Sequence, residues 1–344
     1  MTDFFLLVIG TGTVYMLSVP GYNGPISDHF NGNTFVNQEP LESHGFGAFL
    51  KFMFRSERQP WRDWTDNKSY PPPPERVDSC QLRVTFINHS TVLIQMDGLN
   101  ILTDPIWSKR CSPFSWIGPS RHRAPGLALE SLPPLDFVLV SHNHYDHLDL
   151  PTLKKLVGKF HMPIITSLGN KQFLEQNGID DVTEIDWGDR IPLSESVALT
   201  GVPARHFSGR GLSDRQTTLW MGFVLQGSAG NVYFAGDTGF GSHFEKIRKQ
   251  FAPIRLAILP IGAYLPRWFM SGVHLSPEEA VRAHQVLGAA AGIAIHFGTF
   301  RLGVDGQDQA VEDLIAALDR VTGPRPLFWT LDFGEGRDVP PLPD

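Results

Sequence analysis

One short stretch near the middle of the chain concentrates side chains that can bind a metal ion. Within residues 141–149, three imidazoles and one carboxylate occur in six positions: His142, His144, Asp146 and His147. Neutral imidazole and carboxylate are the ligand types that zinc prefers. The apolar segment Phe137–Val140 leads directly into this run, as a buried strand leads into a loop. We therefore expect a metal-binding loop. The alternative is a polar loop that happens to be rich in histidine.

Further ligands must come from other parts of the chain, because a loop of four cannot surround one tetrahedral metal with good geometry. Three side chains share one context, in which an apolar segment is followed by the side chain and a glycine-containing loop. They are His206, Asp237 and His296. Strand ends that meet on one rim are where sites form in sheet-based folds. The sequence therefore predicts that these residues join the histidine loop.

The elements that must position these residues are short strands alternating with helices. Regular structure is expected from about residue 81, with a hairpin turn at Asp97-Gly98. Ser276, Pro277 and Glu279 together give three agreeing signals for the start of a helix. The second half of the chain repeats the order of strands followed by helices. Two such halves predict two sheets packed together, with helices outside.

The ends of the chain differ in character from its middle. We expect an irregular extension over residues 1–78, a catalytic domain over 79–336 and a C-terminal tail over 337–344. Residues 4–20 are mostly apolar but slightly short for a membrane span, and no basic residue precedes them. Two interpretations stay open: a weak anchor or uncleaved signal-like segment, or a short helix or strand packed on the domain.

Composition excludes several classes of protein. The 344 residues are 42% hydrophobic and 19% charged, which is typical of a globular chain with a sizeable core. The formal net charge is -7 and no basic block stands out, so we expect no nucleic-acid partner. Cys80 and Cys111 form neither a disulfide framework nor a paired metal motif. We expect a protein that is cytoplasmic or peripheral to an inner membrane.

The pattern His-x-His-x-Asp-His at 142–147, followed by His206, Asp237 and His296, resembles the metallo-β-lactamase superfamily in its two-metal form. The resemblance covers about residues 80 to 335 and implies an α+β fold, a four-layer αββα sandwich with metals at one edge. It implies two Zn²⁺ per chain, with iron or manganese as alternatives. It also implies a division of the ligands: His142, His144 and His206 on the first metal, Asp146, His147 and His296 on the second, and Asp237 on both.

Other segments resemble the branch of N-acyl-phosphatidylethanolamine-hydrolysing phospholipases D. They are residues 88–94, 102–107, 260–264, 266–270, 274, 277–280 and 294–300. The resemblance implies a phosphodiesterase that releases phosphatidic acid and an N-acylethanolamine from a phospholipid at a membrane surface. Two alternatives stay open: a metallo-hydrolase of a soluble lactone or phosphoester, and a non-catalytic membrane-associated scaffold. The oligomeric state is left open, with a homodimer among the choices.

Two zinc ions about 3.5–4 Å apart can share a water and lower its pKa to near neutrality, so that the resulting hydroxide is the nucleophile. Asp237 is expected to orient this water, and the carboxylate of Asp146 is typical of a hydrolytic site. His274 is a candidate proton donor to the oxyanion or leaving group; the alternative is a bond to a neighbouring carbonyl. Asp149 is expected either to orient a ligand histidine or to cap the next helix.

The substrate contacts are less constrained by the sequence. Arg121 and Arg123 are candidates for a phosphate head group, against the alternative of a solvated basic loop. Tyr264 and Trp268 are candidates for an apolar groove that holds acyl chains, against packing on the core. His89 follows the first strand and either lines the site or makes a hydrogen bond in a turn.

Overall fold

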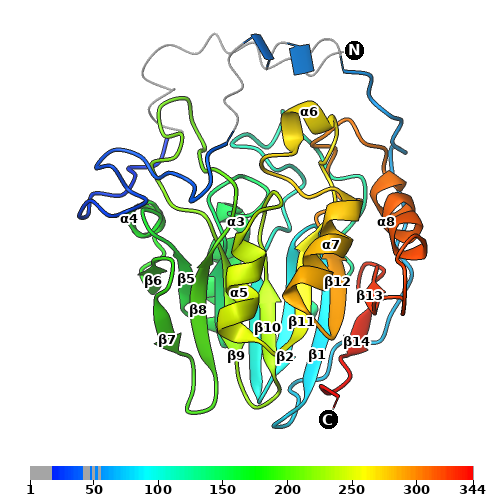
Figure 1. Ribbon diagram of the computed structural model, residues 1–344. Helices are drawn as coiled ribbons and strands as arrows, with labels where there is room; N and C mark the ends of the chain where they lie inside the picture. Colours follow the sequence, from blue (N-terminus) through cyan, green and yellow to red (C-terminus); the bar gives the residue numbers. More distant parts are fainter. Residues whose placement is uncertain (1–17, 42–46, 49–50, 53–55, 344) are drawn as a thin grey trace.

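Two seven-stranded sheets face each other across the centre of the molecule, and helices cover their outer faces (Figure 1). The computed structural model describes residues 18–41, 47–48, 51–52 and 56–343.

The first sheet has the strand order β14-β1-β2-β3-β4-β5-β6. Its strands are β1 (Leu82–Asn88), β2 (Thr91–Met96), β3 (Leu99–Thr103), β4 (Phe137–Val140), β5 (Ile164–Ser167), β6 (Val182–Ile185) and β14 (Gly336–Asp338). Strands β1 to β3 are antiparallel, whereas β3 to β6 run parallel. The turn between β2 and β3 is the predicted Asp97-Gly98, and both residues have positive φ, as a tight hairpin requires.

The second sheet has the order β13-β12-β11-β10-β9-β8-β7. Its strands are β7 (Arg190–Pro192), β8 (Ala198–Pro203), β9 (Met221–Gln226), β10 (Asn231–Phe234), β11 (Ile254–Pro260), β12 (Ala291–Ile295) and β13 (Phe328–Trp329). Strands β7 to β10 are antiparallel, and β10 to β13 are parallel. The loops after β10, β11 and β12 therefore leave the sheet at the same edge.

Helices complete the two outer layers. They are α3 (Leu150–Phe160), α4 (Lys171–Gln176), α5 (His243–Phe251), α6 (Arg267–Met270), α7 (Pro277–Leu287) and α8 (Gln309–Asp319). Leu153 of α3 and Leu174 of α4 pack with the first sheet, whereas Phe244 of α5, Leu287 of α7 and Leu314 of α8 pack with the second. The order of layers is helix, sheet, sheet, helix, which confirms the predicted α+β sandwich.

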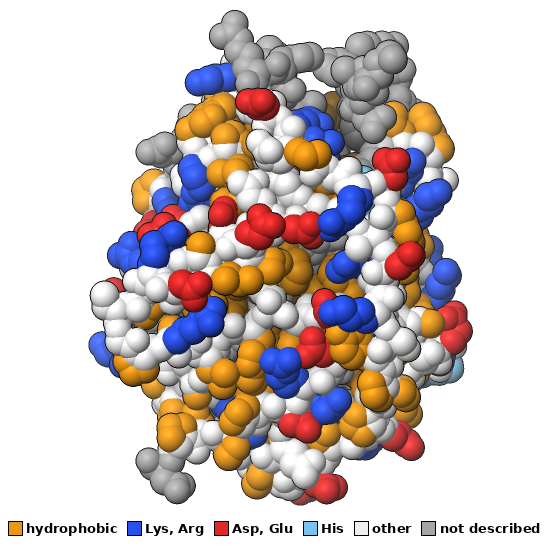
Figure 2. Space-filling model, turned by 90° about the vertical axis from the view of Figure 1, so that its right-hand side faces the viewer, with side chains coloured by type: hydrophobic (Ala, Val, Ile, Leu, Met, Phe, Trp, Pro, Cys, Tyr) orange, Lys and Arg blue, Asp and Glu red, His pale blue; other side chains and the backbone are white. Residues whose placement is uncertain are grey.

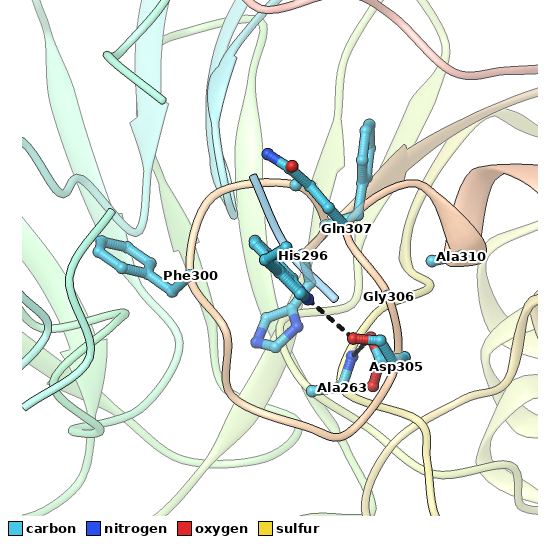
Figure 3. A pocket seen from close by; sticks show the side chains of 10 residues that line it. Ala263, His296, Phe300, Asp305, Gly306, Gln307 and Ala310 are labelled. Atoms are coloured by element: carbon cyan, nitrogen blue, oxygen red, sulfur yellow. Dashed lines mark hydrogen bonds between the residues drawn. The ribbon is translucent and has the colours of Figure 1, made fainter. Parts of the chain in front are cut away.

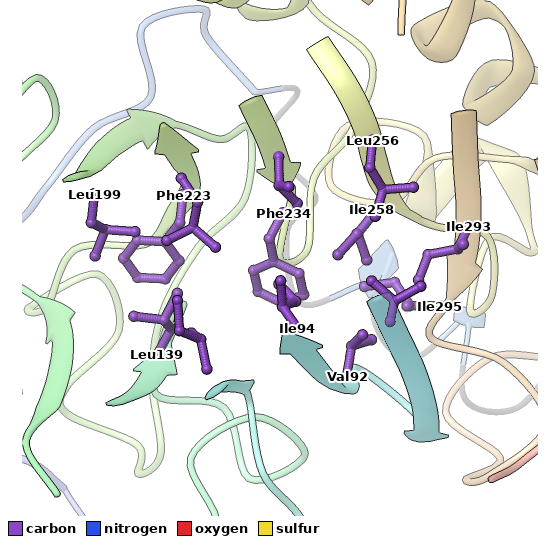
Figure 4. Packing of buried hydrophobic residues seen from close by; sticks show 14 of the residues in the cluster. Val92, Ile94, Leu139, Leu199, Phe223, Phe234, Leu256, Ile258, Ile293 and Ile295 are labelled. Atoms are coloured by element: carbon purple, nitrogen blue, oxygen red, sulfur yellow. The ribbon is translucent and has the colours of Figure 1, made fainter. Parts of the chain in front are cut away.

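The main core lies between the sheets. Ile94 and Leu139 of the first sheet meet Phe223, Phe234 and Ile258 of the second, and all five are buried (Figure 4). Full burial of such a side chain contributes about 1.5–3 kcal/mol. The packing fixes how the strands of the two sheets are placed, and with them the loops at their ends.

Some short elements are not predicted from the sequence, including β6, β7, α6 and β14. Arg337 and Asp338, which the sequence places in a tail, belong to β14 and pair with Val84 and Arg83 of β1. The first sheet therefore extends past the predicted boundary at 336. A three-residue, partly exposed edge strand carries too little apolar alternation to be recognised.

The described parts of the N-terminal extension lie against the main domain. The backbone N–H of Tyr22 donates to Thr217 O at 2.8 Å, and the Trp61 indole donates to Asp305 O at 2.8 Å. Of the apolar segment 4–20, residues 4–17 lie outside the described residues. Among the residues that are described, no helix is long and apolar enough to cross a membrane.

Candidate metal centre

Loops from both sheets bring the candidate ligands together at one edge of the sandwich. The histidine loop follows β4, whereas His206, Asp237 and His296 follow β8, β10 and β12. A hydrogen bond of 3.1 Å from Met221 N to Ser141 O ties the two sheets at this point. The site is therefore built on the ends of packed strands, which hold side chains more rigidly than an isolated loop does.

One group of donor atoms consists of three imidazole nitrogens. Nδ1 of His144 lies 2.9 Å from Nε2 of His142 and 3.3 Å from Nε2 of His206. Zinc–nitrogen bonds of about 2.0–2.1 Å at tetrahedral angles place ligand atoms about 3.3 Å apart. The Nδ1–H of His206 donates to Val273 O at 2.9 Å, which leaves Nε2 as the lone-pair nitrogen. The spacing and tautomer therefore fit a bound metal.

A second group lies beside the first. Oδ2 of Asp146 lies 3.4 Å from Nε2 of His147 and 3.3 Å from Nε2 of His296. Nε2 of His147 has no hydrogen-bond partner among the described residues, although the side chain is completely buried. These spacings again match ligand atoms around one ion.

Asp237 connects the two groups. Its Oδ2 lies 3.2 Å from Nε2 of both His147 and His296, and 3.7 Å from Nε2 of His206. Its Oδ1 is buried and accepts no hydrogen bond from any residue that the structure describes. A buried carboxylate is costly unless it is paired with charge or coordinates metal, so this arrangement fits a ligand shared by two ions.

The pKa shifts of the clustered residues are those expected of a site that binds cations. Burial lowers the pKa of His144 to about 4 and that of His206 to about 3, so both are neutral and offer a lone pair. Burial alone would raise the pKa of Asp146 and of Asp237, but neighbouring imidazoles outweigh it and hold both carboxylates ionised. Burial would also lower the pKa of His296, yet Asp237 and Asp146 raise it to about 9. Metal binding would displace that proton.

Asp104 is a functional residue that the sequence did not reveal. Its Oδ2 accepts from Nδ1–H of His147 at 2.7 Å, and its Oδ1 accepts from Ser141 N at 2.7 Å. A carboxylate behind a ligand histidine fixes the tautomer and raises the basicity of the ligating nitrogen. Asp104 lies at the end of β3 inside a segment that supports the family resemblance, but nothing marks it off from an ordinary turn residue.

The orienting role that was considered for Asp149 is wrong. Asp149 accepts from Ser108 N at 3.1 Å, from Ser108 Oγ at 2.8 Å and from Thr152 Oγ1 at 2.5 Å. It does occupy the N-cap position of α3, although its side chain makes no cap hydrogen bond. Its carboxylate holds the loop after β3 against the helix, and Asp104 orients the histidine instead.

His89 makes contacts with the candidate site beyond the hydrogen bond that was expected in a turn. The residue has a left-handed backbone with φ of 45°, and its carbonyl accepts from His296 N at 2.7 Å. Its buried ring places Nε2 2.9 Å from Oδ2 of Asp146. The ring therefore also contacts the site, as a donor to a candidate ligand or as an additional nitrogen near the second group.

His274 lies beside the cluster, where a proton donor was expected. Its Nδ1 is 3.9 Å from Oδ2 of Asp237, and its ring centroid is 5.2 Å from that of His206. The alternative of a bond from this nitrogen to a carbonyl is not found, since Nδ1 has no hydrogen-bond partner among the described residues. Burial lowers the pKa of His274 to about 3, so the ring is neutral.

The structure does not support a substrate role for Arg121 or Tyr264. Arg121 is 7% exposed, and its guanidinium donates to the carbonyls of Ser108 and Ile106 at 2.9 and 3.1 Å. It is neither a head-group ligand nor part of a solvated loop, because these carbonyls take up its donors. Tyr264 is 4% exposed and its hydroxyl donates to Asp313, so it packs in the core.

The two other substrate candidates, Arg123 and Trp268, are at least partly exposed. The Arg123 guanidinium stacks over the ring of Phe333 at 4.5 Å. Trp268 is 39% exposed on α6, in the loop that leaves β11 toward the same edge as Asp237 and His296. Of the four predicted substrate residues, Trp268 is the most exposed.

The N-terminal extension also reaches the site. The Asn37 side chain accepts from His206 N at 3.0 Å and donates to His206 O at 2.8 Å. It thus holds the backbone of a candidate ligand from both sides. This contact could not be recognised from the sequence, because 169 residues separate the two partners.

Comparisons with known proteins agree with this geometry. The β-lactamase superfamily domain matches residues 99–297 of the chain. An uncharacterized protein of Mycobacterium tuberculosis is 43% identical over 249 residues, which cover 71% of this chain and 66% of that relative. The N-acyl-phosphatidylethanolamine-hydrolyzing phospholipase D 1 of Caenorhabditis elegans is 41% identical over 273 residues, which cover 74% of this chain and 75% of the relative.

A solved structure shows the same fold at lower identity. The crystal structure of a possible metal-dependent hydrolase from Veillonella parvula has a TM-score of 0.60 and 19% identity, and the match covers 75% of this chain and 99% of that one. The family match, the two-sheet sandwich and the histidine–aspartate cluster at its edge lead to one conclusion. This chain belongs to the metallo-β-lactamase superfamily of metal-dependent hydrolases, in the branch that includes N-acyl-phosphatidylethanolamine-hydrolysing phospholipase D.

Proposed function

We propose that this chain is a two-metal phosphodiesterase that cleaves N-acylphosphatidylethanolamine into phosphatidic acid and an N-acylethanolamine. The observation that carries the proposal is the position of Asp237, whose Oδ2 lies within 3.7 Å of donor nitrogens from both groups. The similarity to a lipid hydrolase of Caenorhabditis elegans, at 41% identity, supports the substrate class.

The ligand sets follow from the two groups of donor atoms. We assign His142, His144 and His206 to the first ion, and Asp146, His147 and His296 to the second, with Asp237 on both. Mainly nitrogen donors at tetrahedral spacing favour Zn²⁺ over harder ions. When bound, such a pair of ions lowers the pKa of a shared water and offsets the charge that develops on the phosphoryl oxygens.

The side chains around the ions hold and move protons. Asp237 is the buried carboxylate that accepts a proton from the attacking water, because its Oδ1 has no hydrogen-bond partner among the described residues. Nδ1 of His274 lies 3.9 Å from Oδ2 of Asp237, where it can take up that proton from Asp237 and pass a proton on to the departing ethanolamine oxygen. Asp104 keeps His147 in one tautomer. Trp268 is the proposed acyl contact at this edge.

The direct test uses the purified protein loaded with zinc and N-acylphosphatidylethanolamine in detergent micelles. Phosphatidic acid and N-acylethanolamine should form in equal amounts and should disappear on addition of a chelator. In water enriched in ¹⁸O, the label should enter phosphatidic acid, because water attacks phosphorus.

Three other results would contradict the proposal. Label in another product would show a different bond cleavage. Turnover of a soluble phosphodiester or lactone without turnover of the lipid would identify a soluble substrate. Fewer than one metal per chain after loading, with no turnover, would favour a scaffold without catalysis.

A further inference from the structure

A small cavity lies beside His296, on the side of the second candidate metal. Trp61, Ala263, Asp305 and Gln307 contribute to its lining, and its volume is about 10 Å³ (Figure 3). A space of about 10–15 Å³ is what a single water molecule needs, provided that the walls offer polar partners.

The cavity has two such partners on its walls. Nδ1 of His296 and Oδ1 of Asp305 are both buried, and neither has a hydrogen-bond partner among the described residues. The two side chains are only 3% and 5% exposed and lie across the cavity from each other (Figure 3). The described residues show no direct hydrogen bond between these two atoms.

The carboxylate of Asp305 is held in place independently of His296. Its Oδ2 accepts from Ala263 N at 3.2 Å, and its backbone carbonyl accepts from the Trp61 indole at 2.8 Å. The other oxygen, Oδ1, has no hydrogen-bond partner among the described residues, and Asp305 is one of the residues that line the cavity. A buried carboxylate oxygen and a buried ring N–H rarely remain without a partner.

We propose that Asp305 is a positioning residue for His296 and acts through one buried water. The water accepts from Nδ1–H of His296 and donates to Oδ1 of Asp305. This inference rests on the proposed metal site, because its consequence is a fixed tautomer of a ligand. With the proton held at Nδ1, the lone pair of Nε2 points to the place between Asp146 and Asp237.

With this water in place, both histidines of the second metal have a carboxylate behind the ring, His147 directly and His296 through the water. His147 donates directly to Asp104, and His296 would donate through water to Asp305. His206, in the first group, donates to the neutral carbonyl of Val273. Because a carboxylate partner raises the basicity of a ligating imidazole more than a carbonyl does, the second site would hold its metal through two strengthened nitrogens.

The variant that tests this idea is Asp305→Asn, with Asp308→Asn as its matched control. The asparagine oxygen can still accept from Ala263 N, so the loop keeps its anchor, but the negative acceptor toward the cavity is lost. Asp308 lies on the same loop and pairs with Arg62 at the surface. The control therefore removes the same charge without touching the cavity.

Zinc affinity, measured by competition with a chelator, should fall about 10-fold or more for the ion of the second group in Asp305→Asn and stay unchanged in Asp308→Asn. A crystal structure of the zinc-loaded wild type should show one water bonded to both His296 Nδ1 and Asp305 Oδ1. A cavity without that water, or wild-type affinity in Asp305→Asn, overturns the inference. Failure of the wild type to bind zinc would instead overturn the proposed function.

Discussion

Nδ1 of His147 lies 2.7 Å from Oδ2 of Asp104, and neither side chain is exposed to solvent. This pair predicts the effect of Asp104→Asn. The neutral amide removes the charge that supports His147, so zinc affinity should fall about 10–100-fold, as for other carboxylates behind ligand histidines. Chelator competition measures the change.

Asp149→Asn is the natural control for that variant, since Asp149 bonds Ser108 and Thr152 rather than a histidine. It should leave zinc affinity unchanged. Equal losses in the two variants would show that the effect is general destabilisation of the loop.

His89 predicts a difference between two substitutions. His89→Leu removes the donor that lies 2.9 Å from Asp146, so metal content should fall from two ions per chain toward one. His89→Gln carries an amide N–H at a similar distance from the backbone and should retain both ions. Metal content is measured by elemental analysis after dialysis. Equal metal content in the two variants would argue against a hydrogen bond as the cause.

Replacing the shared carboxylate should be the most damaging change at the site. Asp237→Asn should lower kcat at least about 100-fold, because the amide neither bridges two cations nor accepts a proton. Circular dichroism should show an intact fold, and Asp319→Asn, at an exposed position of α8, should behave as wild type. If Asp237→Asn keeps full activity, the two-metal arrangement is wrong.

His274 should matter for chemistry and not for metal content. His274→Gln should lower kcat about 10²–10⁴-fold on the lipid, which has a poor leaving group that needs a proton. An aryl phosphodiester, whose leaving group departs without protonation, should lose much less. A similar loss on both substrates would mean that His274 does not act as the proton donor.

His29 predicts a pH dependence of stability far from the metals. Burial would lower the pKa of His29, but hydrogen bonds to Asp186 and Asp28 outweigh it and raise the pKa above 6.5. A group whose pKa is raised by folding stabilises the protein below its unfolded pKa of about 6.5, and this contribution is lost as pH rises through the folded value. The Tm of the wild type relative to His29→Gln should therefore be higher at pH 6 than at pH 9. A constant difference would contradict the ion pair with Asp186.

The sequence predicted the fold and the clustered residues for a definite physical reason. Four potential metal ligands, His142, His144, Asp146 and His147, lie within six positions directly after an apolar strand. His206, Asp237 and His296 could be added because each follows a buried strand, and parallel strands end at one edge.

The supporting residues were not predictable in this way. Asp104 and Asn37 are single polar residues of the kind found in any loop, and each contacts a histidine that is distant in sequence. Asp305 is likewise unremarkable in the sequence, and only the folded chain places it at the same cavity as His296. For Arg121, the sequence predicted a role that the structure does not support. Its charge predicted a phosphate contact, but the folded chain surrounds its guanidinium with carbonyls. Such roles depend on tertiary packing, which local composition does not encode.

Charged side chains of both signs are mixed on the surface of the molecule. One face of the molecule shows lysine, arginine and acidic side chains interspersed with small hydrophobic areas, without a field of a single sign (Figure 2).

The pairing of β14 with β1 has a consequence for how the protein is made. Arg83 and Asp338, which also form an ion pair, are 255 residues apart. During synthesis, β1 remains without this neighbour until residues 336–338 have left the ribosome. Contacts of such high sequence separation slow folding and leave a sheet edge exposed in the meantime. A shortened chain that ends before residue 336 should therefore be recovered mainly as aggregates.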